Sequence, residues 1–220
     1  MAGLTSAKAQ GLLFYLLLTG RMHTRAALAA LLWGDISDTA ARRNLRKVLQ
    51  ELREQVGAYL AIERDAVALQ EGADVWVDVV EFETILSESS APEAPARVQR
   101  ALDLYRGDFL EGFYVHDAPD FEAWWLSERT RLRELLLSGL HDLAAYRAES
   151  DELETAIALI RRLIRLEPWR EEAHRHLMTW LALSGQRGAA LAQYEHCRKI
   201  LADKLGVEPA EAVVFEDAVS

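Results

Sequence analysis

The chain has 220 residues and a mass of 24.8 kDa, enough for one large domain or two modest ones. Hydrophobic residues make up 50% of it, which excludes a wholly disordered chain, and the 12 Gly and 5 Pro are too few for a fibrous or low-complexity protein. The lone Cys197 cannot form an internal disulfide, and the longest apolar run, Leu12–Leu18, is far shorter than a bilayer span. We therefore expect a cytoplasmic protein without a membrane partner.

Charge is distributed unevenly along the chain. The formal net charge of −10 excludes a protein that coats nucleic acid with its whole surface. Residues 1–56, however, carry eight Lys and Arg against four Asp and Glu, a net +4, whereas residues 57–96 carry a net −8 and residues 97–220 a net −6. This asymmetry predicts a small polyanion-binding module at the N-terminus, attached to an acidic body with another role.

Three helices are predicted in the first 56 residues. Ser6 is placed to cap a helix that ends near Leu18, before Thr19-Gly20, and Thr24 to cap a helix over residues 25–32. A third helix, capped by Asp38 or Thr39, is expected to end near Val56, before a glycine.

The third predicted helix has two distinct faces. At about 100° per residue, an apolar stripe lies around Leu45, and a polar face follows it from about 60° to about 200°. That polar face carries five cations and a glutamine: Arg42, Arg43, Arg46, Lys47, Gln50 and Arg53. Among these positions only Glu54 is acidic, which argues against a helix that pairs its own charges. One face anchored in protein and the other rich in guanidinium groups is typical of a DNA recognition helix.

Two β-prone segments follow, residues 59–64 and 66–70, and predict a hairpin with Arg64 at its turn. A wing tip that enters a minor groove would use an arginine there, so Arg64 is a further candidate DNA contact. The segment 75–79 is expected to be a β-prone or extended connector before a short helix over 80–86. The Ser-, Pro- and Glu-rich segment 87–95 is the expected domain linker.

Everything after the linker is predicted to be helical: residues 96–106, 118–148, 151–166, 170–184, 187–205 and 209–218. Ala156, Ile160 and Leu166 recur as Ala190, Tyr194 and Ile200 at an offset of 34, the tetratricopeptide period. We therefore expect a fold that is mainly α: a winged helix-turn-helix domain, with three helices and a β-hairpin wing, followed by an all-α tetratricopeptide-like repeat domain.

Nothing in the sequence predicts an enzyme, a cofactor or a metal site. Phosphate-binding glycine loops and HExxH are absent, and a single cysteine excludes the usual structural zinc sets. His174 and His176 look like a metal pair, but side chains two residues apart on a helix point about 200° apart. We interpret them as surface or interhelix histidines.

Three groups of residues resemble a known family. Leu32-Trp33-Gly34-Asp35, Ala41 to Arg46 and Leu52-Arg53 are similar to the winged helix of the Streptomyces antibiotic regulatory proteins. Ala101 to Gly112 resembles the opening motif of the bacterial transcriptional activation domain, and its later helices are matched by Trp169 to Met178, Tyr194-Glu195 and Leu205 to Pro209. The resemblance covers nearly the whole chain.

This resemblance implies a transcriptional regulator, expected to be an activator, that binds promoter repeats of double-stranded DNA through residues 1–88. The family's N-terminal β-platform is expected to be missing from that winged helix, because the sequence begins almost at the first helix. Residues 96–220 would form the tetratricopeptide-like activation domain, acting through RNA polymerase or a neighbouring protomer on DNA. An alternative stays open: an interaction scaffold whose helical repeats bind a partner and whose basic helix is a docking patch.

Overall fold

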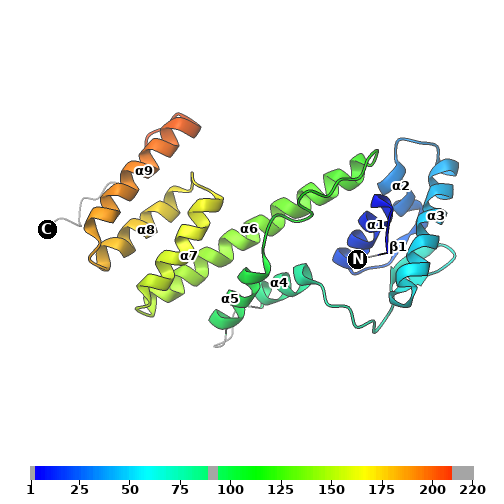
Figure 1. The fold of residues 1–220 in the computed structure, drawn as a ribbon, viewed down its shortest axis with the longest axis horizontal. Helices are drawn as coiled ribbons and strands as arrows, with labels where there is room; N and C mark the ends of the chain where they lie inside the picture. Colours follow the sequence, from blue (N-terminus) through cyan, green and yellow to red (C-terminus); the bar gives the residue numbers. More distant parts are fainter. Residues whose placement is uncertain (1–2, 89–93, 210–220) are drawn as a thin grey trace. The chain divides into compact units, whose positions relative to one another are not determined.

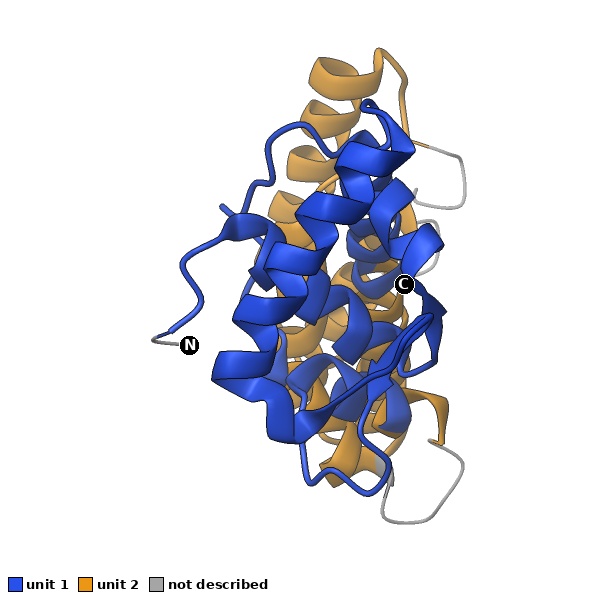
Figure 2. Cartoon of the chain, turned by 90° about the vertical axis from the view of Figure 1, so that its right-hand side faces the viewer, with its two compact units in different colours: residues 1–84, 104–133 blue, residues 85–103, 134–220 orange. Residues whose placement is uncertain are grey.

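The computed structural model describes residues 3–88 and 94–209, and these form two compact units. The first unit contains residues 1–84 and 104–133, and the second contains residues 85–103 and 134–220 (Figure 2). Most of the predicted linker and nearly all of the predicted helix over 209–218 lie outside the described residues. The division into domains over 1–88 and 96–220 stays a prediction.

The first unit opens with three helices: α1 (Ala7–Thr19), α2 (Arg25–Trp33) and α3 (Asp38–Val56) (Figure 1). The predicted caps of the first two are confirmed, because the side chains of Ser6 and Thr24 accept hydrogen bonds from the backbone of Ala9 and Ala27. The predicted cap of α3 is wrong by one residue or two: Ser37 occupies the N-cap and Asp38 the first turn. A carboxylate in the first turn still favours the positive end of the helix dipole.

A small antiparallel sheet accompanies these helices. The predicted hairpin is confirmed as β2 (Leu60–Ile62) and β3 (Ala66–Leu69), preceded by the short 3-10 helix η1 (Gly57–Tyr59). A third strand that the sequence did not predict, β1 (His23–Thr24), pairs with β3 through His23 and Val67, so the sheet order is β1-β3-β2. Because β1 joins α1 to α2, this pairing fixes the wing to the helices.

The core of the first unit combines the N-terminal helices with residues from much later in the chain. Leu12, Leu28 and Leu52, one from each of α1, α2 and α3, are 0% exposed. Phe121, near the start of α6 (Pro119–Glu149), is also 0% exposed and belongs to the same hydrophobic cluster. The N-terminal helices are therefore completed by a segment that follows residue 104.

The remaining helices are α4 (Asp78–Ser87), α5 (Ala94–Leu104), α7 (Leu153–Leu166), α8 (Glu171–Leu183) and α9 (Arg187–Leu205) (Figure 1). In the second unit, α8 packs against both α7 and α9. No described helix is long and apolar enough to cross a membrane.

The predicted 34-residue repeat appears in the turns of the second unit. The turn between α6 and α7 has Asp151 at φ 61°, and Gly185 takes the same left-handed conformation, at φ 80°, in the turn between α8 and α9. The amides of Glu152 and Gln186 donate to the carbonyls five residues earlier, at 2.8 Å in both turns. The same backbone turn thus recurs 34 residues apart, as a tetratricopeptide-like stack requires.

Candidate nucleic-acid interface

Helix α3 buries one face and exposes the other. Its buried side chains, which pack into the core of the first unit, are Ala41, Leu45, Val48, Leu49 and Leu52. All six residues of the predicted polar face are exposed: Arg42, Arg43, Arg46, Lys47, Gln50 and Arg53. The structure therefore places the predicted recognition residues on the solvent side of a helix that is held rigidly by its core.

The cations of this face are not paired with any carboxylate that the structure describes. Within the described part of the chain, none of Arg42, Arg43, Arg46, Lys47 and Arg53 forms an ion pair. Two like-charged pairs lie four residues apart, Arg42 with Arg46 and Arg43 with Lys47. Such pairs destabilise a helix by about 0.2–0.5 kcal/mol each. The basic face thus costs stability unless an external anion neutralises it.

The two acidic residues in the second half of α3 are occupied elsewhere. Glu51 Oε1 accepts hydrogen bonds from the backbone amides of Thr5 and Ser6, at 2.8 and 3.1 Å, and so ties α3 to the start of α1. Glu54 Oε1 accepts from the side-chain amide of Gln50 at 2.6 Å. Neither carboxylate pairs with the cations beside it.

A small hollow of about 190 Å³ opens beside α3, between α2 and β2. It is lined by Arg25, Arg46, Leu49, Gln50, Arg53 and Ile62. The structure therefore brings Arg46, Gln50 and Arg53 together around one concavity, whereas Arg42, Arg43, Lys47 and Arg64 lie outside it. Three guanidinium groups around a hollow of this size suit a phosphate oxyanion.

Arg25 is a candidate residue that sequence reasoning missed. It is the first residue of α2 and half-buried, and its Nε atom is buried with no hydrogen-bond partner among the described residues. Its backbone amide donates to the carbonyl of Asp65, at 2.9 Å, which links α2 to the wing. The available signal was its position directly after the cap Thr24, at the start of the helix that precedes the recognition helix, because this first helix of a helix-turn-helix crosses the DNA backbone.

Arg64 lies exposed in the turn between β2 and β3, as predicted. Its neighbours Glu63 and Asp65 are exposed too, so this turn carries a net negative charge. The amide of Glu63 donates to the carbonyl of Ala66, at 2.9 Å, and closes the turn. Arg64 therefore offers a weaker attraction for phosphate than the α3 face does.

Lys8, the first cation of the chain, serves the packing of the first unit. Its Nζ atom donates to the carbonyls of Leu32 and Asp117, at 2.6 and 2.9 Å, and lies 4.8 Å from the centre of the Trp33 ring. Burial lowers the pKa of Lys8, although Asp117 and Asp35 oppose that shift. These contacts hold the ammonium group of Lys8 within the first unit, so Lys8 does not belong to the basic face of α3.

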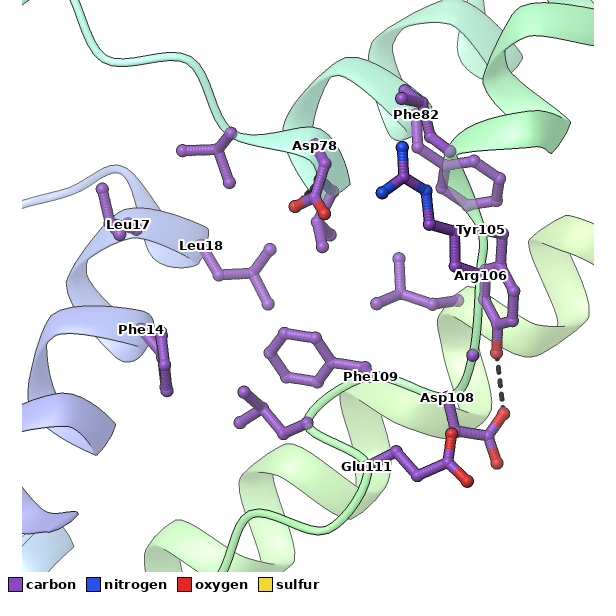
Figure 3. Close-up of a pocket in the computed structure, with 16 residues that line it drawn as sticks. Phe14, Leu17, Leu18, Asp78, Phe82, Tyr105, Arg106, Asp108, Phe109 and Glu111 are labelled. Carbon is purple, nitrogen blue, oxygen red and sulfur yellow. Dashed lines mark hydrogen bonds between the residues drawn. The ribbon is translucent and has the colours of Figure 1, made fainter. Parts of the chain in front are cut away.

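The first unit also holds a larger pocket, of about 440 Å³ (Figure 3). Figure 3 shows Phe14 and Leu18 of α1 on one side of it and Phe82 and Phe109 on the other. The Tyr105 hydroxyl donates to Asp108 at 2.8 Å, and burial, followed by this hydrogen bond, raises the pKa of Tyr105. None of the predicted DNA-binding residues is among the residues that line this pocket, so it is separate from the candidate interface.

Comparisons with known proteins identify the family. Residues 77–215 match the bacterial transcriptional activator domain. The regulatory protein AfsR of Streptomyces coelicolor is 30% identical over 202 residues, covering 88% of this chain and 20% of that protein. AfsR of Streptomyces griseus is 27% identical over 204 residues with the same coverage. The chain thus spans about a fifth of the length of these relatives.

A solved structure shares the fold. Mycobacterium tuberculosis EmbR, in complex with a low-affinity phosphopeptide, superposes with a TM-score of 0.70 and 23% sequence identity, over 94% of this chain and 57% of that one. The family match begins near α4, whereas the AfsR alignments also reach the helices and wing before it. The chain belongs to the bacterial transcriptional activator domain family and is similar to the Streptomyces antibiotic regulatory proteins.

Proposed function

We propose that this protein is a DNA-binding transcriptional activator that reads promoter repeats through α3. The observation that carries the proposal is the exposed face of five cations and one glutamine, with no ion pair among the described residues. A self-repelling face of this kind is favourable when a polyanion neutralises it, and duplex DNA offers about one phosphate charge per 1.7 Å of its axis. A helix with its other face buried also has the shape that enters a major groove.

The residues divide into two roles in this proposal. Arg42, Arg43 and Lys47, which lie outside the hollow, are placed to reach base edges or the far strand. Arg25 and Arg53, which line the hollow with Arg46, hold a backbone phosphate and so fix the register of α3 in the groove. Arg64 adds a phosphate or minor-groove contact from the wing.

The helical repeats supply the activating function in this proposal. We infer that residues 96–220 contact RNA polymerase or a neighbouring protomer on adjacent promoter repeats, while residues 1–88 hold the DNA. The match to the activator domain over residues 77–215 supports an activating role for these helices. The protein would then act in the cytoplasm, where bacterial promoters lie, and regulation rather than catalysis would be its role.

The test is a mobility-shift titration of the purified chain against the upstream region of its own operon, with scrambled DNA of the same length as competitor. Wild type should bind the upstream region specifically, and Arg43→Ala should weaken that binding by about 5- to 150-fold, the value of about 1–3 kcal/mol for one bidentate contact. The matched control is Arg161→Ala, which removes an exposed arginine from α7 in the second unit and should leave the affinity unchanged.

The alternative, a scaffold with a basic docking patch, predicts a different result in the same assay. Binding would then be weak, would fall steeply with salt and would be equal for the upstream and scrambled DNA. That outcome would contradict the assignment of α3 as a recognition helix.

A further inference from the structure

A cluster of metal-ligand side chains lies in the second unit, between α6 and α8. It consists of His141 from α6 and of Glu172 and His176 from α8. The Nε2 atom of His141 lies 3.2 Å from Nδ1 of His176 and 3.9 Å from Oε1 of Glu172. One ligand atom from each of the three residues lies within 4.8 Å of the others.

These separations fit the coordination sphere of a small divalent transition metal. Two nitrogen atoms bound tetrahedrally at about 2.0–2.1 Å from a zinc ion lie about 3.3–3.4 Å apart. The observed separation of 3.2 Å between the imidazole nitrogens is already close to that value. Glu172 and His176 are four residues apart on α8, so their side chains share one face of the helix. Glu172 is exposed, and its Oε1 atom already lies 3.9 Å from Nε2 of His141.

Neighbouring residues hold the two rings in place. The ring of His176 stacks on Trp180 with 5.4 Å between centroids and an angle of 10° between planes. The other nitrogen of His141, Nδ1, lies 3.4 Å from Oδ1 of Asp142, an arrangement that orients a metal-binding imidazole. Burial, followed by the charge of His141, lowers the pKa of His176.

The neighbouring His174 is not available to bind a metal ion, because both of its ring nitrogens are hydrogen-bonded. It is 0% exposed, its Nε2 atom is 2.8 Å from the carbonyl of Pro168, and its Nδ1 atom is 2.6 Å from Nε2 of Gln193. The two histidines of α8 therefore point to different partners, as their spacing predicts. The contact between His176 and His141 joins residues 35 positions apart, which the spacing within α8 does not show.

We propose that His141, Glu172 and His176 bind one divalent transition-metal ion of the zinc class, with the fourth position open to water. Two imidazoles and one carboxylate with an open position form a ligand set that zinc accepts. The bound ion joins α6 to α8 and so stabilises the helical repeats. Arg175, whose Nη2 atom is 3.8 Å from Oε1 of Glu172, competes with the ion for that carboxylate.

The experiment uses the full chain without a polyhistidine tag. Isothermal titration with ZnCl₂ should give saturable binding of one ion per chain, and CoCl₂ should give the visible absorption bands of a tetrahedral site. Thermal unfolding should shift to higher temperature with Zn²⁺. His141→Gln and His176→Gln should each weaken the affinity by at least about tenfold. His116→Gln, which changes an exposed histidine of the first unit, should bind like wild type.

Circular dichroism shows whether each variant folds. If either histidine variant unfolds, Glu172→Gln carries the test, because the exposed Glu172 side chain is not required for packing. Binding that does not saturate, or that is unchanged in every folded variant, overturns the proposal and leaves a hydrogen-bonded histidine pair. The result is independent of DNA binding, which needs no residue of this cluster.

Discussion

Helix α3 and the second unit differ in how their cations are paired. In the second unit several arginines pair with glutamates, as Arg147 does with Glu152 at 2.7 Å and Arg170 with Glu134 at 2.8 Å. On α3 the five cations stand together, and no described residue pairs with any of them. An arginine that pairs with a carboxylate has its charge neutralised within the fold, whereas unpaired cations that lie close together destabilise the fold until an anion binds them. The comparison indicates that α3 is built to bind and the paired arginines are built to hold helices together.

The largest expected effect separates the buried face of α3 from its basic face. Leu45→Ala removes a side chain that is 2% exposed, and we expect it to lower the free energy of unfolding by about 2–5 kcal/mol through the cavity it leaves. Urea denaturation followed by circular dichroism measures this loss. A loss below about 1 kcal/mol would mean that α3 is not anchored as the structure shows.

The next effect concerns base recognition. Arg43→Ala should leave the free energy of unfolding unchanged within about 0.5 kcal/mol, since the side chain is exposed and unpaired among the described residues. If Arg43 contacts a guanine bidentately, its loss costs about 1–3 kcal/mol of affinity and relaxes the preference at one base pair. Titration against operators with single base changes measures both. Lost stability together with unchanged DNA affinity would reverse the roles of the two faces.

Because His174 is buried in the core of the second unit, the free energy of unfolding should depend on pH. Burial lowers the pKa of His174 from its ordinary 6.5, despite an opposing hydrogen bond to the Pro168 carbonyl. The unfolded chain therefore binds a proton at His174 more readily than the folded chain does. The stability that the neutral His174 ring contributes is complete above pH 6.5, and it is lost as the pH falls through the lower pKa of the folded state. His174→Gln should therefore reduce the loss of stability between about pH 7.5 and about pH 5.5. Urea midpoints at the two pH values test this, and equal losses in both proteins would contradict it.

A paired arginine should show the opposite pattern to Arg43. Arg170→Ala removes ion pairs to Glu134 and Glu167, both at 2.8 Å, from a side chain that is 36% exposed. Because solvent and salt screen such pairs, we expect a loss of about 0.5–1 kcal/mol in the free energy of unfolding and no change in DNA affinity. Denaturation in low and high salt checks the first part, and a mobility-shift titration the second. A clear loss of DNA affinity would contradict the distinction between the basic face of α3 and the paired arginines of the second unit.

The smallest expected effect is that of Arg64→Ala. Its turn also carries Glu63 and Asp65, so we expect a modest loss of affinity and a salt slope of binding reduced by about one unit. The slope of log affinity against log salt concentration measures this. An unchanged slope would show that the wing does not reach DNA through this residue.

Local patterns predicted much of this molecule. The caps Ser6 and Thr24 and the two faces of α3 depend on neighbours within a turn or two, and the sequence carries those relations directly. The 34-residue repeat is visible because similar residues recur at a fixed offset. The features it did not predict join distant segments. β1 is only two residues long and pairs with residues more than 40 positions later, and Arg25 reaches the α3 face only once the three helices have packed. Phe121 completes the core of α1 to α3 for the same reason.

The central claim is that the unpaired basic face of α3 recognises a DNA sequence. Selecting bound duplexes from a random-sequence pool, with the wild-type chain and with a variant in which Arg42, Arg43 and Arg46 are glutamine, tests it most directly. The account predicts that wild type enriches one repeated motif and that the folded variant enriches none. Failure of the wild type to enrich any motif, or enrichment of the same motif by the variant, would contradict it.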